Sequence, residues 1–160
     1  FESLPGLQAR VLGADPELGR VAAVVELPAR YASPDDVEFR ESFEFYVLEG
    51  EVRFGADALV AGDFAFVPPG ARMPVLASKR GARLLAFHDP STADAEALGR
   101  QQKQGPYVTR GADARWSPGT VSQAAGVNVP LEVKHLKKDP WTGARTWLVR
   151  LDGGVEVPWE

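Results

Sequence analysis

The sequence contains no cysteine, only two histidines and a single methionine among its 160 residues. The lack of cysteine excludes disulfides, thiolate nucleophiles and cysteine-ligated metals, and it fits a reducing compartment, so we predict a cytoplasmic protein. The sequence has no run of about 18 apolar residues, which argues against a membrane-spanning helix. Lysine and arginine do not gather into a phosphate-binding face, and the net charge of −4 argues against nucleic acid as a partner.

What the sequence does have is 16 glycines and 13 prolines that separate short β-rich runs. This punctuation predicts an all-β jelly-roll barrel. The stretch "FEFYVLEGEVRFG" (43–55) suggests strand, turn, strand, and "ALVAGDFAFVPPG" (58–70) repeats that order around Ala61-Gly62-Asp63. Two further runs are predicted to be strands, "VAAVVEL" (21–27) and "RLLAFHD" (83–89).

One short helix is expected at "TADAEALGRQQKQ" (92–104), which begins near Ser and Thr and stops before Gly105-Pro106. We therefore divide the chain into a barrel at 1–91 and a connector at 92–130.

The remainder, 131–160, is predicted to form the first strands of a second barrel, because the chain repeats itself. Residues 12–36 and 136–160 share seven identities in 25 positions, including an Asp-Pro pair and a glycine in a turn before a strand. The alternative is two unrelated hairpins with similar turns. The basic stretch "VKHLKKD" (133–139) is expected to be a solvated strand edge.

Residues 40–73 resemble the cupin superfamily. In "GDFAFVPPGARM" (62–73) the glycine, proline and second glycine have the spacing of the second cupin motif. Cupin motifs use H-x-H because alternate side chains of a strand share one face, so two imidazoles reach one interior metal.

The cupin metal ligands are not at their positions in this sequence. Phe43 stands where the glutamate of the first motif is expected, and Met73 where the histidine of the second is expected. The H-x-H region falls at "DDVEF" (35–39), where Asp36 and Glu38 could at best imitate it. We expect the acidic residues to form a solvated rim and the first barrel to bind no metal. These residues are Asp36, Glu38, Glu41 and Glu44.

Four stretches are similar to two-barrel ureidoglycine aminohydrolases: "LPGLQARVL" (4–12), "PELGRVAAVVEL" (16–27), "FYVLEGEV" (45–52) and "VPPGARM" (67–73). The resemblance implies a first barrel without ligands and a second barrel that holds Mn²⁺. It implies release of ammonia from (S)-ureidoglycine to give (S)-ureidoglycolate, with a small ureido compound as the substrate. It maps one metal ligand onto this sequence, Glu160; other catalytic residues stay unknown. Cupin barrels commonly pair, so a homo-oligomer is expected.

Two other readings stay open. The barrel could be a metal-free binding or structural module, with an interior drawn from Phe43, Phe45, Phe64, Phe66 and Met73; strand alternation must turn half of these aromatics outward. Alternatively, the protein is another cupin enzyme, such as a dioxygenase or isomerase. H-x-H after residue 160 would favour a dioxygenase, whereas E-x-H would favour the aminohydrolase.

Overall fold

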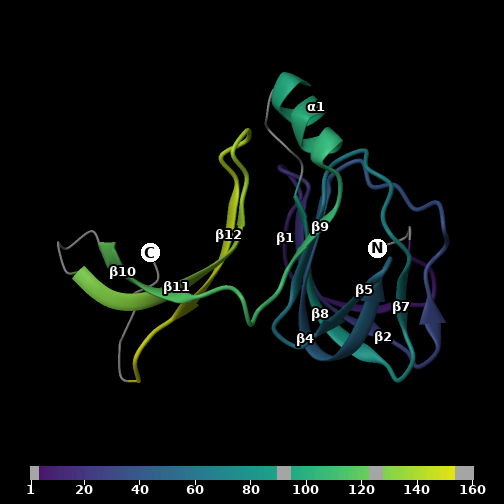
Figure 1. Ribbon diagram of the computed structural model, residues 1–160, viewed down its shortest axis with the longest axis horizontal. Coiled ribbons are helices and arrows are strands. Elements are labelled where there is room, and N and C mark those ends of the chain that lie inside the picture. Colours follow the sequence, from purple (N-terminus) through teal and green to yellow (C-terminus); the bar gives the residue numbers. More distant parts are fainter. Residues whose placement is uncertain (1–3, 90–94, 123–127, 154–160) are drawn as a thin grey trace.

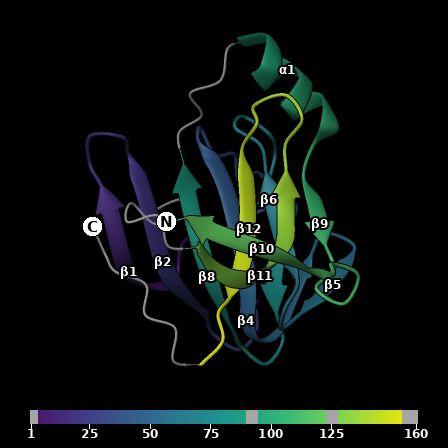
Figure 2. The ribbon, with the colours of Figure 1, turned by 90° about the vertical axis from the view of Figure 1, so that its left-hand side faces the viewer.

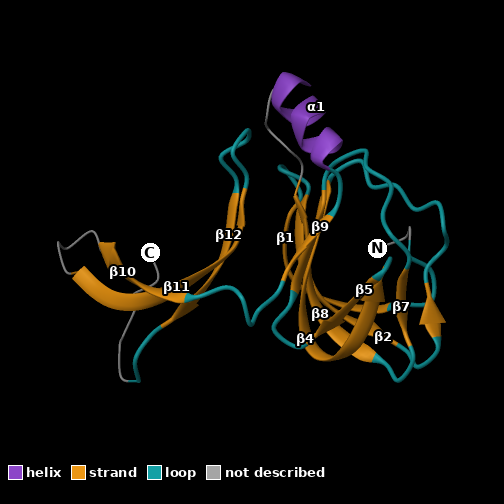
Figure 3. Cartoon of the chain, in the orientation of Figure 1, coloured by secondary structure: helices purple, strands orange, loops and turns teal. Residues whose placement is uncertain are grey.

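The structure, a computed structural model, describes residues 4–89, 95–122 and 128–153. Its antiparallel strands form two sheets, as Figures 1 and 3 show. The larger, nine-stranded sheet runs β1-β2-β8-β4-β6-β9, with β5 and β7 paired to β4 and β3 paired to β7; the smaller runs β10-β11-β12. The elements are β1 (Gln8–Asp15), β2 (Arg20–Leu27), β3 (Tyr31–Ala32), β4 (Ser42–Phe54), β5 (Asp57–Val60), β6 (Phe64–Val67), β7 (Leu76–Ser78), β8 (Ala82–Asp89), α1 (Ala95–Gln104), β9 (Tyr107–Thr109), β10 (Trp116–Ser122), β11 (Asn128–Lys138) and β12 (Arg145–Arg150).

The predicted fold class is confirmed: the chain is mostly β-strand, in jelly-roll sheets, with one short helix. The strands expected at 21–27 and 83–89 are β2 and β8, and the helix expected at 92–104 is α1. Its first residues, 92–94, lie outside the described part of the chain. In the described part, no helix is long and apolar enough to cross a membrane.

The strand-turn-strand prediction for 43–55 is wrong, because β4 is one long bent strand. Gly50 does not reverse the chain: it has a φ of 81° and stays paired with Ala82 of β8. A Cβ on Gly50 would lie 2.6 Å from a carbonyl oxygen of the β7–β8 loop, so only glycine fits this close approach. The reversal comes after Phe54, which pairs with Asp57.

Strand alternation divides the aromatic residues of β4 and β6 between two sides of the sheet, as expected. Phe43 and Phe45 lie in the main core inside the barrel. Phe64 and Phe66 point outward and form a second apolar cluster with Leu136 of β11. The outer face of the barrel is therefore apolar where the smaller sheet meets it.

The smaller sheet lies against this outer face, in front of β4, β6 and β8 in Figure 2. Besides the Leu136 contact, the Thr109 hydroxyl donates to the Leu136 carbonyl at 2.7 Å, and the Lys134 ammonium donates to the Gly111 carbonyl at 2.9 Å. The expectation that 133–139 is a solvated edge is wrong: β11 is the central strand of its sheet, and Leu136 and Lys137 are buried.

The segment expected as a connector, 92–130, contributes a strand to each sheet. β9 pairs with β6, and β10 pairs with β11. The turn after β9 is held by Asp63, whose carboxylate accepts from the N–H groups of Val60 (3.0 Å) and Gly111 (2.8 Å) and from the Arg110 guanidinium (3.2 Å). Burial alone would raise the pKa of Asp63, but these donors outweigh it and hold the pKa below its ordinary value.

The hairpins β1–β2 and β11–β12 have the same register. Gln8 pairs with Glu26, and 124 residues later Glu132 pairs with Arg150. Each of the remaining residue pairs of the second hairpin also corresponds to a pair of the first after the same shift of 124. Both registers slip by one residue at the corresponding place, which is Val11/Gly13 in the first hairpin and His135/Lys137 in the second.

The turns of the two hairpins match as well. In each, the aspartate before the turn accepts two backbone N–H bonds through Oδ1, Asp15 at 3.1 and 3.0 Å and Asp139 at 2.8 and 2.7 Å. The glycine that ends each turn is left-handed, with a φ of 68° at Gly19 and 71° at Gly143. A shared register, bulge and turn favour a true repeat over two unrelated hairpins.

Candidate functional site

The segments that carry the cupin motifs lie side by side at one end of the barrel. The Gly70 N–H donates to the Phe39 carbonyl at 2.7 Å, and the Met73 N–H donates to the Val37 carbonyl at 2.9 Å. Val37 and Phe39 are buried in the core, whereas Asp36 and Glu38, with the alternate side-chain direction, are exposed. The two carboxylates suggested as imitations of H-x-H therefore point away from the interior.

Apolar side chains occupy the interior positions where cupins carry ligands. Phe43 is 1% exposed and stacks on Phe39, with ring centroids 4.6 Å apart. Met73 is also 1% exposed and belongs to the same core cluster. The His88 ring packs against Phe39 and Phe43 at 5.0 and 5.1 Å, and burial lowers its pKa to about 4, so the imidazole is neutral at neutral pH.

These residues do not fit a metal in the first barrel. A transition-metal site needs three or four nitrogen or oxygen ligands that converge on one point. Within 4–89, 95–122 and 128–153, no group of three or more His, Asp or Glu side chains is close enough to share an ion. The one ligand that the resemblance assigned, Glu160, lies outside the described residues.

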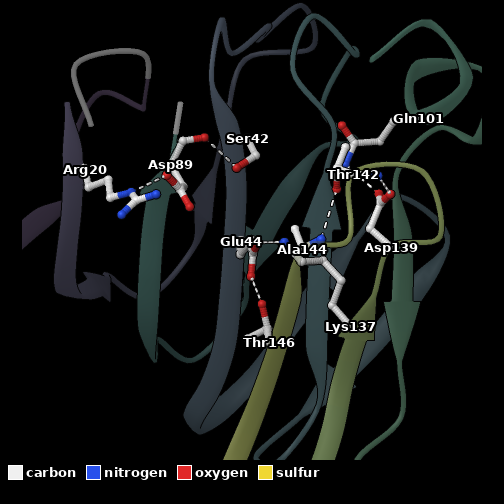
Figure 4. Close-up of polar contacts among 10 residues, drawn as sticks. All are labelled: Arg20, Ser42, Glu44, Asp89, Gln101, Lys137, Asp139, Thr142, Ala144 and Thr146. Carbon is white, nitrogen blue, oxygen red and sulfur yellow. Dashed lines mark hydrogen bonds and ion pairs between the residues drawn. The ribbon is translucent and has the colours of Figure 1, made fainter. Parts of the chain in front are cut away.

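The most distinctive polar cluster lies between the two sheets, around Glu44 (Figure 4). The Lys137 ammonium forms an ion pair with the Glu44 carboxylate, and the Thr146 hydroxyl donates to the second carboxylate oxygen at 2.6 Å. The side chains of Glu44 and Lys137 are 7% and 5% exposed. The expected acidic rim is therefore wrong for Glu44, because β11 and β12 cover it.

Two further contacts lie near the ion pair of Glu44 and Lys137. The Lys137 ammonium also lies 4.4 Å from the centroid of the Phe66 ring, a cation–π contact. Asp139, at the end of β11, accepts a 2.6 Å hydrogen bond from the Gln101 amide of α1. Burial, Glu44 and Asp139 together raise the pKa of Tyr107, which keeps its phenol protonated. Each charged group faces a partner within the protein, an arrangement suited to docking one sheet on the other.

A pocket of about 460 Å³ opens beside this cluster, between the tip of β1–β2 and the start of β12. Arg20 and Asp89 form an ion pair of 2.8 Å at its edge, and the Ser42 hydroxyl donates to the Asp89 carbonyl (Figure 4). Gly13 and Ala22 line it; they are the repeat counterparts of Lys137 and Thr146. At these two positions the first hairpin has small residues that border the pocket, whereas the second hairpin has Lys137 and Thr146, which bind Glu44.

Sequence reasoning did not find this inter-sheet cluster. Glu44 and Lys137 are separated by 93 residues, and each stands among other charged residues of the same sign. The available signal was the outward direction of Glu44 on β4, opposite Phe66 of β6, because the outward aromatics of β6, Phe64 and Phe66, also needed a cover.

Comparisons with known proteins identify the fold. No protein-family model and no curated protein matches the sequence. A solved candidate dioxygenase of Nostoc punctiforme is 18% identical with a TM-score of 0.63, over 94% of this chain and 53% of its own. A solved candidate glyoxylate-induced protein of Pseudomonas aeruginosa is 16% identical with a TM-score of 0.55, over 87% and 58%. A cupin superfamily protein of Desulfitobacterium hafniense is 15% identical with a TM-score of 0.44, over 54% and 80%.

This chain therefore spans little more than half of the length of the first two solved proteins. At these identities the likeness concerns the fold alone. With the jelly-roll sheets and the single short helix, it leads to one conclusion: the chain has a cupin-like jelly-roll fold, which it shares with these two solved proteins.

Proposed function

We propose that this chain is the first part of a two-barrel hydrolase that replaces the amine of (S)-ureidoglycine with a hydroxyl from water. The products are ammonia and (S)-ureidoglycolate. The chemistry belongs to the second barrel and to the Mn²⁺ held there, and the first barrel has a structural role. This proposal rests on the sequence resemblance at 4–12, 16–27, 45–52 and 67–73.

The observation that carries the two-barrel part is the duplicated hairpin. In the first copy, the inward side chains of β2 lie in a closed core. Their counterparts on and after β12, Trp147, Val149 and Leu151, are exposed among the described residues. An apolar face of this kind needs a cover, and further strands of a second barrel would supply one.

One observation supports placing the chemistry in the second barrel, and another supports the proposed reaction. Phe43 and Met73 fill the ligand positions of the first barrel, which supports assigning the proposed metal centre to the second barrel. Ureidoglycolate is also the adduct of urea with glyoxylate, so an enzyme that forms it works one chemical step from glyoxylate. The fold likeness to a candidate glyoxylate-induced protein agrees with that chemistry.

The role of Glu160 as a metal ligand makes a specific demand on the second barrel. Its counterpart in the repeat, Asp36, is exposed, and the next residue, Val37, is buried. If the second barrel copied the first, the inward position would be residue 161. Glu160 can therefore reach a metal only if its strand is shifted by one residue, as a bulge would do.

A dioxygenase is the second candidate, because the solved chain with the TM-score of 0.63 is a candidate dioxygenase. It also requires a metal in the second barrel. The two candidates differ in their co-substrates: an aminohydrolase consumes only water, whereas a dioxygenase consumes O₂.

The test compares the full-length gene product with the 160-residue chain by plasma mass spectrometry and by activity. We expect one Mn²⁺ per full-length chain, ammonia release from ureidoglycine, and neither metal nor activity in the short chain. Glu160→Gln should reduce the metal content of the full-length protein, and Asp36→Asn is its matched control. Oxygen uptake without ammonia release would favour the dioxygenase, and stoichiometric metal in the short chain would contradict a structural first barrel.

We further propose that the protein is a homo-oligomer. The edge strand β1 supports this, since Val11 and Leu12 are 57% and 55% exposed. Sedimentation of the full-length protein tests it, and a monomer at micromolar concentration would contradict it.

A further inference from the structure

A second hollow lies on the opposite side of the barrel, over β3, β4, β5 and β7. In Figure 1, β5 and β7 are on the side of the barrel away from β10–β12. The hollow has a volume of about 610 Å³, within the range of small-molecule pockets. Its lining includes Arg30, Glu51, Arg53, Ala58, Ala77 and Lys79.

The floor of the hollow comes from the pairing of three strands. Arg53 of β4 is opposite Ala58 of β5 on one side and Ala77 of β7 on the other. Side chains directly opposite each other on a sheet share a face, so the guanidinium rises between two methyl groups. No carboxylate stands across from it, and the small neighbours leave space around it.

The charge of the hollow is unbalanced. Arg30, Arg53 and Lys79 line it together with one carboxylate, that of Glu51. Among the described residues, some exposed cations elsewhere on the barrel, such as Arg20 and Arg83, form ion pairs, and others, such as Arg10, do not, but the hollow brings three cations together without one. None of the three cations of the hollow forms an ion pair with a residue in the part of the chain that the structure describes.

The backbone at Arg30 gives an independent indication. Arg30 is the third residue of a turn closed by the Tyr31 N–H to the Pro28 carbonyl at 3.2 Å, and its φ is 64°. It is the one non-glycine residue with positive φ in the described chain, at a turn position that favours glycine. The repeat has glycine there, since the residue 124 positions later is Gly154. Arginine is thus held in a glycine conformation at the rim of a cationic hollow, next to Lys79, whose carbonyl accepts the Arg30 N–H at 3.2 Å.

We propose that this hollow binds a small organic anion with two or three carboxylates on a short carbon skeleton. The guanidinium groups would bind carboxylates in bidentate fashion, and the alanines would contact the carbon skeleton. The site lies on the barrel that has no metal ligands, and it does not depend on the proposed aminohydrolase activity.

The probe is propane-1,2,3-tricarboxylate, which lacks the hydroxyl that makes citrate a strong metal chelator. Calorimetric titration of the purified protein should show a Kd at least tenfold lower than that for acetate at equal ionic strength, and weaker binding at higher salt. Arg53→Gln and Lys79→Gln should each weaken binding about tenfold, and the double variant about a hundredfold. The matched control is Arg10→Gln, an exposed arginine of β1, which should leave the Kd unchanged.

Three results would overturn the proposal. They are no tricarboxylate binding to the unaltered protein, an equal loss in Arg10→Gln, and an unchanged Kd in Arg53→Gln and Lys79→Gln. Pyrophosphate binding that is tighter and equally sensitive to the two variants would overturn the assignment to carboxylates. The urea midpoint of each variant shows whether it is folded.

Discussion

The hairpins β1–β2 and β11–β12 have the same register, bulge and turn, but they bury opposite faces. On β2, the inward residues Ala23, Val25 and Leu27 are 0–3% exposed. Their counterparts Trp147, Val149 and Leu151 are 49%, 48% and 40% exposed. The bulge residue shows the reverse pattern, because Leu136 is 4% exposed and its counterpart Leu12 is 55% exposed. One local structure can therefore serve as the wall of a closed core or as a cover for another barrel.

The largest expected effect concerns the buried ion pair between Lys137 of the second hairpin and Glu44, which has no counterpart in the first hairpin. Lys137→Met leaves the Glu44 carboxylate buried with the Thr146 hydroxyl as its remaining donor. We expect a loss of about 3–5 kcal/mol in the free energy that docks β10–β12 on the barrel, measured by urea unfolding and by hydrogen exchange in β11.

Replacing both partners should restore most of that loss, since an apolar pair of similar volume avoids an unpaired charge. The double variant Glu44→Leu with Lys137→Met tests this. Lys138→Met, at an exposed neighbouring residue, should change stability by less than about 0.5 kcal/mol. If Lys137→Met were equally mild, the ion pair would not explain how the second hairpin differs from the first.

The two turn aspartates allow a matched comparison at the next level. Asp139 is 4% exposed and bonded to Gln101, whereas the turn around Asp15 is exposed. Asp139→Ala should destabilise the protein by about 2–3 kcal/mol and Asp15→Ala by about 1 kcal/mol, measured by urea unfolding. Equal losses would show that the turn alone, rather than the contact with α1, sets the effect.

Asp139 also predicts a pH dependence. Burial alone would raise its pKa, but the N–H groups of Thr142 and Trp141 and the Gln101 amide outweigh it, so the pKa lies below its ordinary value. The unfolded chain then binds a proton at a higher pH than the folded one. The stabilisation is complete above the ordinary aspartate pKa and is lost as the pH falls through the folded value. Asp139→Asn should flatten this acid limb in pH-dependent unfolding, and its persistence would contradict the assignment.

These comparisons show which features could be predicted from sequence. The strands β2 and β8, the turn at Gly62 and the repeated turns follow from local patterns, which depend on few residues. The burial of Glu44 was missed because it depends on Lys137, which lies 93 positions away. The continuation of β4 through Gly50 was missed for a similar reason: glycine permits both a chain reversal and a continuing strand, and the pairing with Ala82 of β8 selects the strand.

A fourth prediction tests whether the exposed face of β12 becomes a core in the full-length protein. Val25→Ala removes two methyl groups from the closed core and should destabilise the protein by about 2 kcal/mol. Val149→Ala, its repeat counterpart, should change the stability of the 160-residue chain by less than about 0.5 kcal/mol. In the full-length protein, unfolding experiments should show a loss similar to that of Val25→Ala. A loss below about 0.5 kcal/mol there would contradict a second closed barrel.

The smallest effect concerns a turn position at which the two copies of the repeat differ in residue type, arginine in the first and glycine in the second. Arg30 has a φ of 64°, and the residue 124 positions later is Gly154. A left-handed conformation costs a non-glycine residue about 1–2 kcal/mol, and replacing that residue with glycine removes this cost. The greater entropy of glycine in the unfolded chain offsets about 0.5–1 kcal/mol of the gain. Arg30→Gly should therefore stabilise the protein by about 0.5–1 kcal/mol in urea unfolding. It should also weaken tricarboxylate binding, because it removes a cation from the hollow.

Ala29→Gly, one residue earlier and outside the left-handed region, should instead destabilise by about 0.5–1 kcal/mol. If Arg30→Gly lost stability as Ala29→Gly does, contacts of the arginine side chain would have to exceed the backbone strain. Arginine would then be explained by folding, and the case for retaining it as a ligand-binding group would lose its backbone support.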